Sequence, residues 1–514
     1  MNPRAATFVA HALSLAALHG PGPWPRSGYP LPDDDPAAGA VILPSVVHDG
    51  VSTHHFRPES QPVSELADLI LARLDEPARL LDALAELQAV RIADDLVREL
   101  RSRPVSREKL RLAARFVVEH ATRREVAKLG IVLLGVSGDE RDGELLQLLG
   151  SLEEFALFAV VALMNTQPDP QRKVFELARR LDGWGRIHAV ERLRGCADPD
   201  IRAWLLRDGF RNGVMNEYLA HLAATTGGLY EALLEPDIDD ALLDGAADIL
   251  RALEMGGPAE DMRDYEDAVP VMHRFGELLD TAEPTLGRLD AALSLRRLIT
   301  RDSFPWPEGE PARLAARYEA LTGQRRWRDL VRRTLVSRGE SAAPPDSDAE
   351  SRAASRYSAN VALSCARRLE MRVWEEAVAC LRSDRHNPYI WQWLLHSDGR
   401  ADVERVAALA AELLPLGELA SGPSESLGLS SEYDADMCLE LVVRKLSDHP
   451  GIGAELIPVA LANRVVRCRR AALTVCQEWP PETRPPEVVA LVRAAADHET
   501  NADLRAEMLA FPPS

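Results

Sequence analysis

Short acidic turns recur along this chain at intervals of about 30 residues. The clearest is Asp198-Pro199-Asp200-Ile201-Arg202, which follows Asp169-Pro170 by 29 residues. Gly138-Asp139 precedes that pair by a similar interval. Each turn is followed by helical periodicity, and each interval has room for two helices. This spacing predicts stacked helical hairpins, an arrangement known as an α-solenoid.

The residues of these turns are suited to begin helices. Asp198 is placed to accept hydrogen bonds from exposed N–H groups, and Pro199 suits the first helical turn. Asp200 faces the positive end of the helix dipole. Ser106 is expected to cap another helix, and Arg202 is available to bridge to a neighbouring acidic turn. We therefore predict an all-α fold.

The charge balance disfavours nucleic acid as a partner. The 514 residues include 60 basic and 80 acidic side chains, which gives a formal net charge of −20. Duplex binding requires a cationic surface. The sharpest basic run, Thr322 to Arg333, encloses Trp327 and offers stacking for bases. Its apolar positions Leu330 and Leu335 instead predict an amphipathic helix with a solvated arginine face.

Compartment signals favour the cytoplasm. The six cysteines are scattered without a CxxC pair, which is typical of a reducing environment. The apolar stretch from Ala5 to Leu18 contains His11 and lacks the strongly basic start of a signal peptide. No run reaches the roughly 18 apolar residues that a spanning helix needs. We expect a cytoplasmic protein without membrane association.

The first residues differ from the rest of the chain. Residues 1–62 are rich in Pro and Gly, which predicts an irregular N-terminal extension. Within it, Asp49-Gly50 lies between the apolar runs 41–47 and 51–53. Because Asp-Gly suits a type I′ turn, this pattern predicts a small β-hairpin.

The remaining chain is expected to form two helical parts. Residues 63–337 are predicted to be the first part of the solenoid. Residues 338–350 are small and acidic and contain two prolines, which predicts a linker. Residues 351–514 are predicted to be the second part.

Several segments resemble known helical repeats. Arg467 to Leu473 and Asp503-Leu504-Arg505 are similar to successive HEAT units. Gly183 to His188, and the stretch from Leu416 to Gly428, resemble segments of a bacterial HEAT-like family of unassigned function. Some members of that family carry a limonene hydroxylase label. The resemblance implies a HEAT-like solenoid fold, and the chain contains no haem, flavin or dinucleotide motif that such a hydroxylase would need.

Candidate binding residues cluster at the turn that begins with Gly183. His188 and Glu191 are three residues apart and share a helix face with Trp184. The structural interpretation is a tight glycine turn with a surface His–Glu contact, and the functional one is a ligand-binding edge. Asn216, a candidate helix cap, lies one repeat further with Glu217 and Tyr218, so these residues extend the same stripe in a solenoid.

A second set of candidates lies in the last third of the chain. The connection from Pro415 to Asp434 is too long for a hairpin turn, and its Gly and Ser residues are suited to cradle an anion. Trp391 and Trp393 are candidate contacts for a protein partner. The full set of candidate binding residues is Trp184, Arg186, His188, Glu191, Asn216, Glu217, Tyr218, Trp391, Trp393, Ser421, Gly422 and Tyr433.

Catalytic and metal motifs are absent from the sequence. It contains no GxSxG, Walker or GxGxxG motif, so no catalytic residue or cofactor is predicted. His48, His54 and His55 form the only histidine cluster, and their spacing matches no standard metal site. We expect these histidines to lie in a loop and predict no metal.

Three functions are consistent with these patterns. The leading hypothesis is a non-catalytic scaffold that binds a protein or peptide on its concave face. The first alternative is a small-molecule-binding protein or enzyme that uses His188, Glu191 and Tyr218 or the 415–434 loop. Convergence of these residues in one pocket would favour this alternative. The second alternative is a nucleic-acid-binding solenoid, and the oligomeric state stays open.

Overall fold

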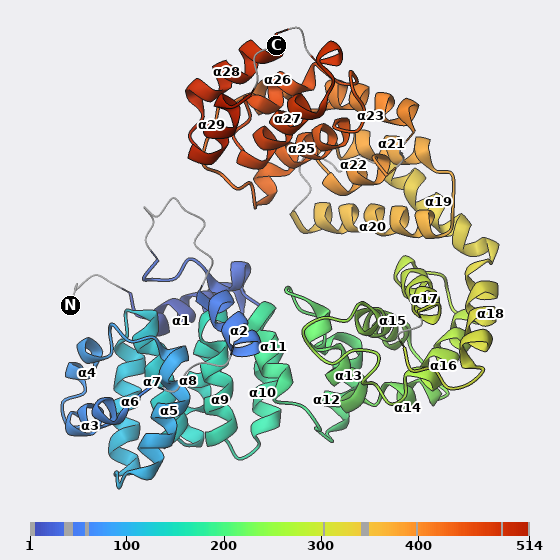
Figure 1. The fold of residues 1–514 in the computed structure, drawn as a ribbon. Coiled ribbons are helices and arrows are strands. Elements are labelled where there is room, and N and C mark those ends of the chain that lie inside the picture. The colour runs from blue at the N-terminus through green and yellow to red at the C-terminus, as the bar shows by residue number, and fades with distance from the viewer. Residues whose placement is uncertain are drawn as a thin grey trace. The chain divides into compact units, whose positions relative to one another are not determined.

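Helices make up the regular structure of the chain (Figure 1). The computed structural model describes residues 6–34, 45–56, 61–301, 304–340, 349–396, 399–484 and 487–511. Within these residues the β-contact is a single isolated bridge between Ser426 and Val465. The all-α prediction is confirmed.

The chain divides into two compact units. The first comprises Met1–Thr281 with Ser294–Arg317, and the second comprises Ala282–Leu293 with Tyr318–Ser514. Two helices, α17 (Leu286–Ile299) and α18 (Glu310–Thr322), contribute residues to both units.

The first unit contains the helices that precede α17. They are α1 (Phe8–His19), α2 (Ser45–His55), α3 (Ser64–Ala72), α4 (Ala78–Ala83), α5 (Ala89–Ser102), α6 (Arg107–His120), α7 (Arg124–Ser137), α8 (Gly143–Gly150), α9 (Ala156–Thr166), α10 (Pro170–Ala178), α11 (Gly183–Glu191), α12 (Pro199–Trp204), α13 (Ala220–Gly227), α14 (Leu229–Leu234), α15 (Asp240–Met255) and α16 (Ala268–Thr281).

The second unit contains the helices that follow α18. They are α19 (Arg325–Glu340), α20 (Ala349–Arg368), α21 (Trp374–Ser383), α22 (Pro388–Leu394), α23 (Arg400–Leu413), α24 (Leu416–Leu419), α25 (Asp434–Leu446), α26 (Leu456–Leu461), α27 (Val466–Glu478), α28 (Val488–His498) and α29 (Ala502–Leu509).

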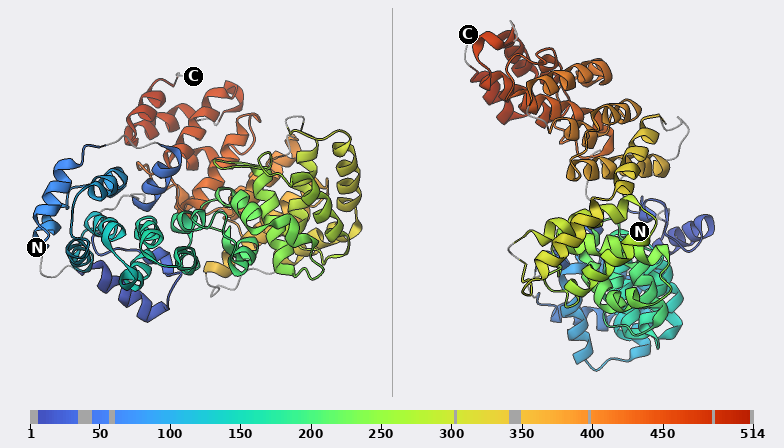
Figure 2. Two further views of the ribbon diagram at one scale, coloured as in Figure 1. Left: turned by 90° about the horizontal axis from the view of Figure 1, so that it is seen from below. Right: turned by 90° about the vertical axis from the view of Figure 1, so that its right-hand side faces the viewer.

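Helices that are close in sequence pack against one another within the first unit. Helix α7 contacts α5, α6 and α9, and α9 also contacts α10 and α11 (Figure 1). The left view of Figure 2 shows the blue-green helices of this unit side by side. From Leu129 to Leu134 helix α7 is apolar around its circumference, and Leu129, Ile131, Leu133 and Leu134 are all fully buried. Burial on every side explains why this stretch shows no polar face in the sequence. Helix α7 therefore lies at the centre of the helices that carry the site described below.

The acidic turns begin helices as predicted. The Asp198 carboxylate accepts hydrogen bonds from two backbone N–H groups at the start of α12, and Asp169 caps α10 in the same way. Ser106 caps α6. Arg202, which the sequence left available to bridge to an acidic turn, donates through Nε to the carbonyl oxygen of Thr226 at 3.1 Å.

Ion pairs connect residues that lie 26–37 positions apart in the sequence. In most of the pairs named below an arginine reaches a carboxylate that lies later in the sequence of the same unit. Examples are Arg111–Asp142, Arg172–Asp198, Arg207–Asp239, Arg211–Asp248, Arg356–Asp384 and Asp436–Arg464, the last with the order of charges reversed.

The predicted β-hairpin is wrong for the residues that the structure describes. Asp49 and Gly50, expected at its turn, lie inside helix α2, and residues 41–44 fall outside the described ranges. Tertiary contacts decide this outcome, because Asp49 pairs with Lys128 and Gly50 lies against the Trp184 indole. The three neighbouring histidines therefore lie on a helix and not in a loop.

The predicted linker is only partly described. Helix α19 continues to Glu340 and α20 begins at Ala349, whereas residues 341–348 lie outside the described ranges. The linker therefore stays a prediction. Among the described residues, no helix combines the length and the apolar character needed to cross a membrane.

Candidate functional site

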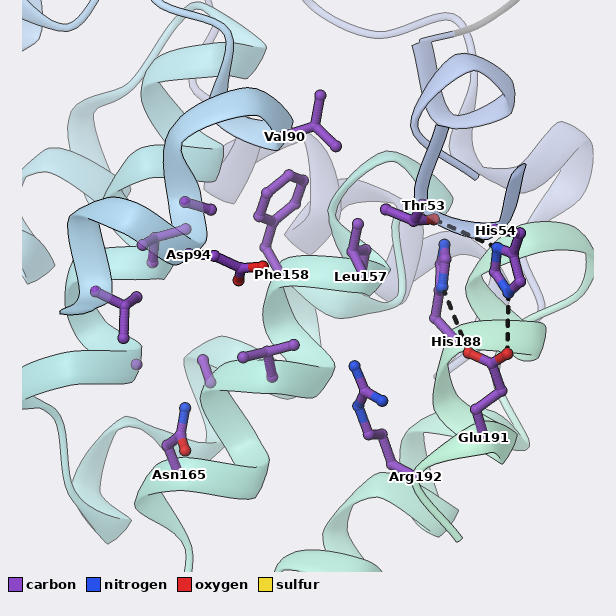
Figure 3. Close-up of a pocket in the computed structure, with 16 residues that line it drawn as sticks. Thr53, His54, Val90, Asp94, Leu157, Phe158, Asn165, His188, Glu191 and Arg192 are labelled. Carbon is purple, nitrogen blue, oxygen red and sulfur yellow. Dashed lines mark hydrogen bonds and ion pairs between the residues drawn. The ribbon is translucent and has the colours of Figure 1, made fainter. Parts of the chain in front are cut away.

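A cavity of about 360 Å³ lies in the first unit, among five of its helices. Its walls come from α2, α5, α7, α9 and α11 (Figure 3). Most of the lining is apolar, and His54, His188 and Glu191 converge at one side. The lining residues are Thr53, His54, Val90, Ala93, Asp94, Val97, Val132, Gly135, Leu157, Phe158, Val161, Ala162, Asn165, His188, Glu191 and Arg192.

Helix α2 is fixed over the cavity by two contacts. The Asp49 carboxylate lies 2.8 Å from Lys128 Nζ, and both side chains are buried. The second contact is between Gly50 of α2 and Trp184. A Cβ added at Gly50 would lie 2.2 Å from the Trp184 indole. Only glycine permits this approach of the backbone to the ring. Together these contacts place His54, four residues after Gly50, at the edge of the cavity.

Helix α11 supplies the facing side chains. It begins at Gly183, whose φ of +64° is a conformation that other residues rarely adopt. The buried Glu153 carboxylate accepts the Gly185 N–H at 2.5 Å, which satisfies an exposed donor of the first turn. Burial raises the pKa of Glu153 to about 8. This start directs His188 and Glu191 toward α2.

The three polar side chains lie within reach of one another. His54 Nε2 is 2.9 Å from Glu191 Oε1, and His54 Nδ1 is 2.8 Å from the carbonyl oxygen of Gly50. His188 Nδ1 lies 4.0 Å from Glu191 Oε2, which is too long for a hydrogen bond. In this arrangement the Glu191 carboxylate faces both imidazole rings (Figure 3).

Burial and the charge of Glu191 shift the pKa values of the two histidines in opposite directions. Burial lowers the pKa of His188 to about 4, so its ring is neutral at pH 7. Burial also lowers the pKa of His54, but the hydrogen bond and charge of Glu191 outweigh it and hold this pKa above its ordinary value. Burial alone would raise the pKa of Glu191. The hydrogen bond and charge of His54 outweigh burial and hold the pKa of Glu191 below its ordinary value.

Aromatic rings surround His54 on the side away from the cavity. Its ring centroid lies 5.2 Å from that of Trp184 and 5.3 Å from that of Tyr218. The Tyr218 hydroxyl is 2.8 Å from His55 Nε2, which adds a second link between α2 and the later helices. Tyr218 thus belongs to the support of the site, although it does not line the cavity.

Three other predicted residues serve neighbouring turns. The Arg186 guanidinium pairs with Asp208 at 2.5 Å and lies over the Trp204 ring. Asn216 Oδ1 accepts the Asn212 N–H at 3.2 Å, so its carboxamide holds the turn in which it lies. Glu217 is half-buried on the same turn. The structure does not bring these three residues to the cavity.

The predicted loop residues belong to the second unit. The Gly422 N–H donates to the carbonyl oxygen of Ala462 at 2.8 Å, and the N–H of Gly428 donates to Ser426 Oγ at 3.1 Å. Since these donors are already used, they do not form the anion cradle that the sequence suggested. Tyr433 lies against the Arg464 guanidinium, and Ser421 is exposed.

The candidate aromatic contacts are mostly part of the core. Trp391 is fully buried, and Trp184 is 5% exposed, so the expectation that these rings are surface contacts is wrong. Trp393 is half-buried, and its Nε1 donates to the Leu363 carbonyl oxygen. Trp327, within the arginine run, is also fully buried and cannot stack on a base.

The sequence did not identify every residue of the site. His188 and Glu191 were named as candidate binding residues, and the alternative interpretation of them as a surface contact is wrong for His188, whose side chain is buried. His54 was assigned to a loop, and Arg192 was not singled out. His54 and Glu191 are separated by 137 positions, so no local spacing pattern could join them.

Comparison with known proteins adds no further assignment. No family model, curated protein or solved structure matches this chain.

Proposed function

We propose that this chain binds a small molecule with an apolar body and a polar head group in the cavity of the first unit. The observation that carries the proposal is the convergence of His54, His188 and Glu191 at one side of a cavity whose lining is mostly apolar. Its other polar lining residues are Thr53, Asp94, Asn165 and Arg192. Sites for small molecules typically have this composition, with volumes of about 300–1,000 Å³. Titratable groups with shifted pKa values are also typical of functional sites.

The two sides of the cavity define the expected ligand. Val97, Val132 and Phe158 offer contact to an apolar body. At the polar side, the exposed Arg192 side chain makes no hydrogen bond or ion pair with any described residue, so its donors are available. A head group that accepts hydrogen bonds, such as a carboxylate or sulfonate, is best suited to this side.

Two matched pairs of variants test the proposal with the fluorescent probe 1-anilinonaphthalene-8-sulfonate. Val161 is 36% exposed at the cavity, so Val161→Trp should obstruct it and weaken probe binding at least tenfold. Leu112, an exposed residue of α6 outside the lining, provides the control Leu112→Trp. Equal binding by wild type and both variants would refute the proposed site.

The second pair tests the polar side. Arg192→Met should weaken binding of the sulfonate probe about fivefold to tenfold, since a charge-assisted hydrogen bond is lost. Competition by decanol should be unaffected, because decanol carries no charge. Arg194→Met is the control, since Arg194 is exposed and pairs with Glu260 away from the cavity. An equal loss in both variants would contradict the role of Arg192.

We also infer that the helices of this chain stack as a HEAT-like array. The ion pairs between residues 26–37 positions apart support this arrangement, because equivalent positions of neighbouring repeats would be separated by one repeat length. A scaffold that binds a protein or peptide stays a prediction. The burial of Trp184 and Trp391 removes two of its proposed contacts.

A further inference from the structure

We infer that His54, His188 and Glu191 form a binding site for one divalent first-row transition metal ion. This inference goes beyond the proposed function, because the site could hold an ion whether or not an organic ligand enters the cavity. It also replaces the prediction from the sequence that no metal is bound. We call these three residues the metal triad.

The distances within the metal triad fit a shared ion. One ligand atom from each residue can be chosen so that all three lie within 4.8 Å of one another. Two ligands about 2.1 Å from an ion lie roughly 3.0–3.4 Å apart, depending on the angle between them. His54 Nε2 and Glu191 Oε1 are 2.9 Å apart, and His188 Nδ1 and Glu191 Oε2 are 4.0 Å apart. The His188–Glu191 separation exceeds that range, so the His188 ring would have to move closer to Glu191 to complete the set.

The unsatisfied state of His188 points to a missing partner. Its ring is 4% exposed, and neither nitrogen makes a hydrogen bond with any described residue. A buried polar group without a partner is costly, and such groups in native structures call for an explanation. A metal ion bound through Nδ1 would give that nitrogen a partner on the side where the ring already faces the Glu191 carboxylate, whereas the buried Nε2 would stay without one (Figure 3).

His54 is held as metal-binding histidines usually are. Its Nδ1 lies 2.8 Å from the Gly50 carbonyl oxygen, so Nδ1 carries the proton and donates it. Without an ion, Nε2 shares a proton with Glu191 across 2.9 Å, and an ion would displace that proton and take the Nε2 lone pair. A backbone carbonyl that fixes the ring and its tautomer is a common outer contact of metal sites. The pairing of Asp49 with Lys128 fixes the helix that carries this carbonyl.

The ligand types select the class of ion. Two imidazole nitrogens and one carboxylate are suited to Zn²⁺ or Fe²⁺, whereas Mg²⁺ and Ca²⁺ prefer oxygen ligands throughout. Three protein ligands leave at least one coordination position open. Because all three residues line the cavity, that position would face a molecule bound there. The ion would then bind the head group directly or through a water molecule.

The simplest competing explanation is a structural hydrogen bond between His54 and Glu191. That contact accounts for two of the three residues, and it gives His188 no role. The two explanations therefore differ in what replacement of His188 does. A structural pair would be indifferent to His188, whereas a metal site would lose a ligand.

Metal titration of the full-length protein distinguishes them. The protein is stripped with a chelator and titrated with Zn²⁺ by calorimetry, and with Co²⁺ by visible absorption, which reports the ligand geometry. We expect one equivalent of Zn²⁺ to bind with submicromolar affinity. His188→Ala and Glu191→Gln should each weaken binding at least 100-fold. His19→Ala is the control, since His19 is an exposed histidine of α1 that lies outside the triad and outside the cavity lining.

Each outcome decides the inference. Absence of stoichiometric binding, or unchanged affinity in both His188→Ala and Glu191→Gln, would overturn it. Circular dichroism confirms that each variant is folded, and Glu191→Gln provides an independent test if His188→Ala does not fold. An anaerobic competition between Fe²⁺ and Zn²⁺ identifies the preferred ion. Sulfonate probe binding in the stripped protein reports on the cavity separately, so failure of the metal site and failure of the proposed function remain distinguishable.

Discussion

Replacement of Lys128 by methionine should release helix α2 from the first unit. Lys128 Nζ lies 2.8 Å from Asp49, 2.6 Å from Glu154 and 3.1 Å from Glu125. The side chains of Lys128 and Glu154 are 1% and 0% exposed. Methionine has a similar length but leaves these carboxylates without their shared cation.

The size of the effect follows from burial. Removal of one partner from a buried ion pair typically costs about 3–5 kcal/mol, because an uncompensated charge is left behind. At about 1.4 kcal/mol for each factor of ten, a loss of 3 kcal/mol is a decrease of more than 100-fold in the equilibrium constant for docking of α2. Hydrogen–deuterium exchange across Ser45–His55 measures this directly as lost protection.

The loss of exchange protection in Lys128→Met should increase as the pH rises. Burial already holds the pKa of Asp49 above its ordinary value, and the charge of Lys128 opposes that shift. Without Lys128 the pKa rises further. An acid whose folded-state pKa is raised destabilises the fold as pH increases above its unfolded value. The variant should therefore lose more protection at pH 7.5 than at pH 5.

Lys109→Met is the matched control. Lys109 pairs with Asp75 in the same unit at 3.0 Å, but the two side chains are 58% and 81% exposed. Exposed pairs of this kind contribute about 0–1 kcal/mol. Equal protection of α2 in wild type and Lys128→Met, or a loss in Lys128→Met that is the same at both pH values, would refute the reasoning.

Two further predictions concern helix caps and thiols. Asp198→Ala should destabilise the first unit by about 1–2 kcal/mol in urea unfolding, because the cap of α12 is lost. Asp200→Ala, at an 80% exposed carboxylate, should cost less than about 0.5 kcal/mol, and equal losses would argue against capping. All six cysteines are buried, and burial raises the pKa of Cys380 to about 11 and that of Cys476 to about 12. Native protein at pH 8 should therefore react with a thiol reagent far more slowly than unfolded protein, and rapid native labelling would contradict this.

The features that could be predicted from sequence are local ones. Asp198 and Ser106 cap helices because a cap depends on a few consecutive residues. The apolar helix α7 is buried on all sides, as its composition indicated. In contrast, Asp49-Gly50 has the local signature of a hairpin turn but lies in a helix. Its conformation is decided by Lys128 and Trp184, which are far away in the sequence.

The site shows the same division between local and distant information. His188 and Glu191 share a helix face, which their spacing predicts. Their burial, and the approach of His54, depend on the docking of α2 against α11. No rule of spacing joins residues 137 positions apart. The amphipathic helix predicted for the arginine run is confirmed, because Trp327 and Leu335 are buried in α19 while Arg328 and Arg332 are exposed.

The docking of α2 has a thermodynamic consequence for any molecule in the cavity. Because one wall and one imidazole come from this helix, occupancy and helix attachment form a linked equilibrium. A ligand present at 100 times its dissociation constant would add about 2.7 kcal/mol to the free energy needed to detach α2. Attachment of α2 and filling of the cavity would therefore stabilise each other.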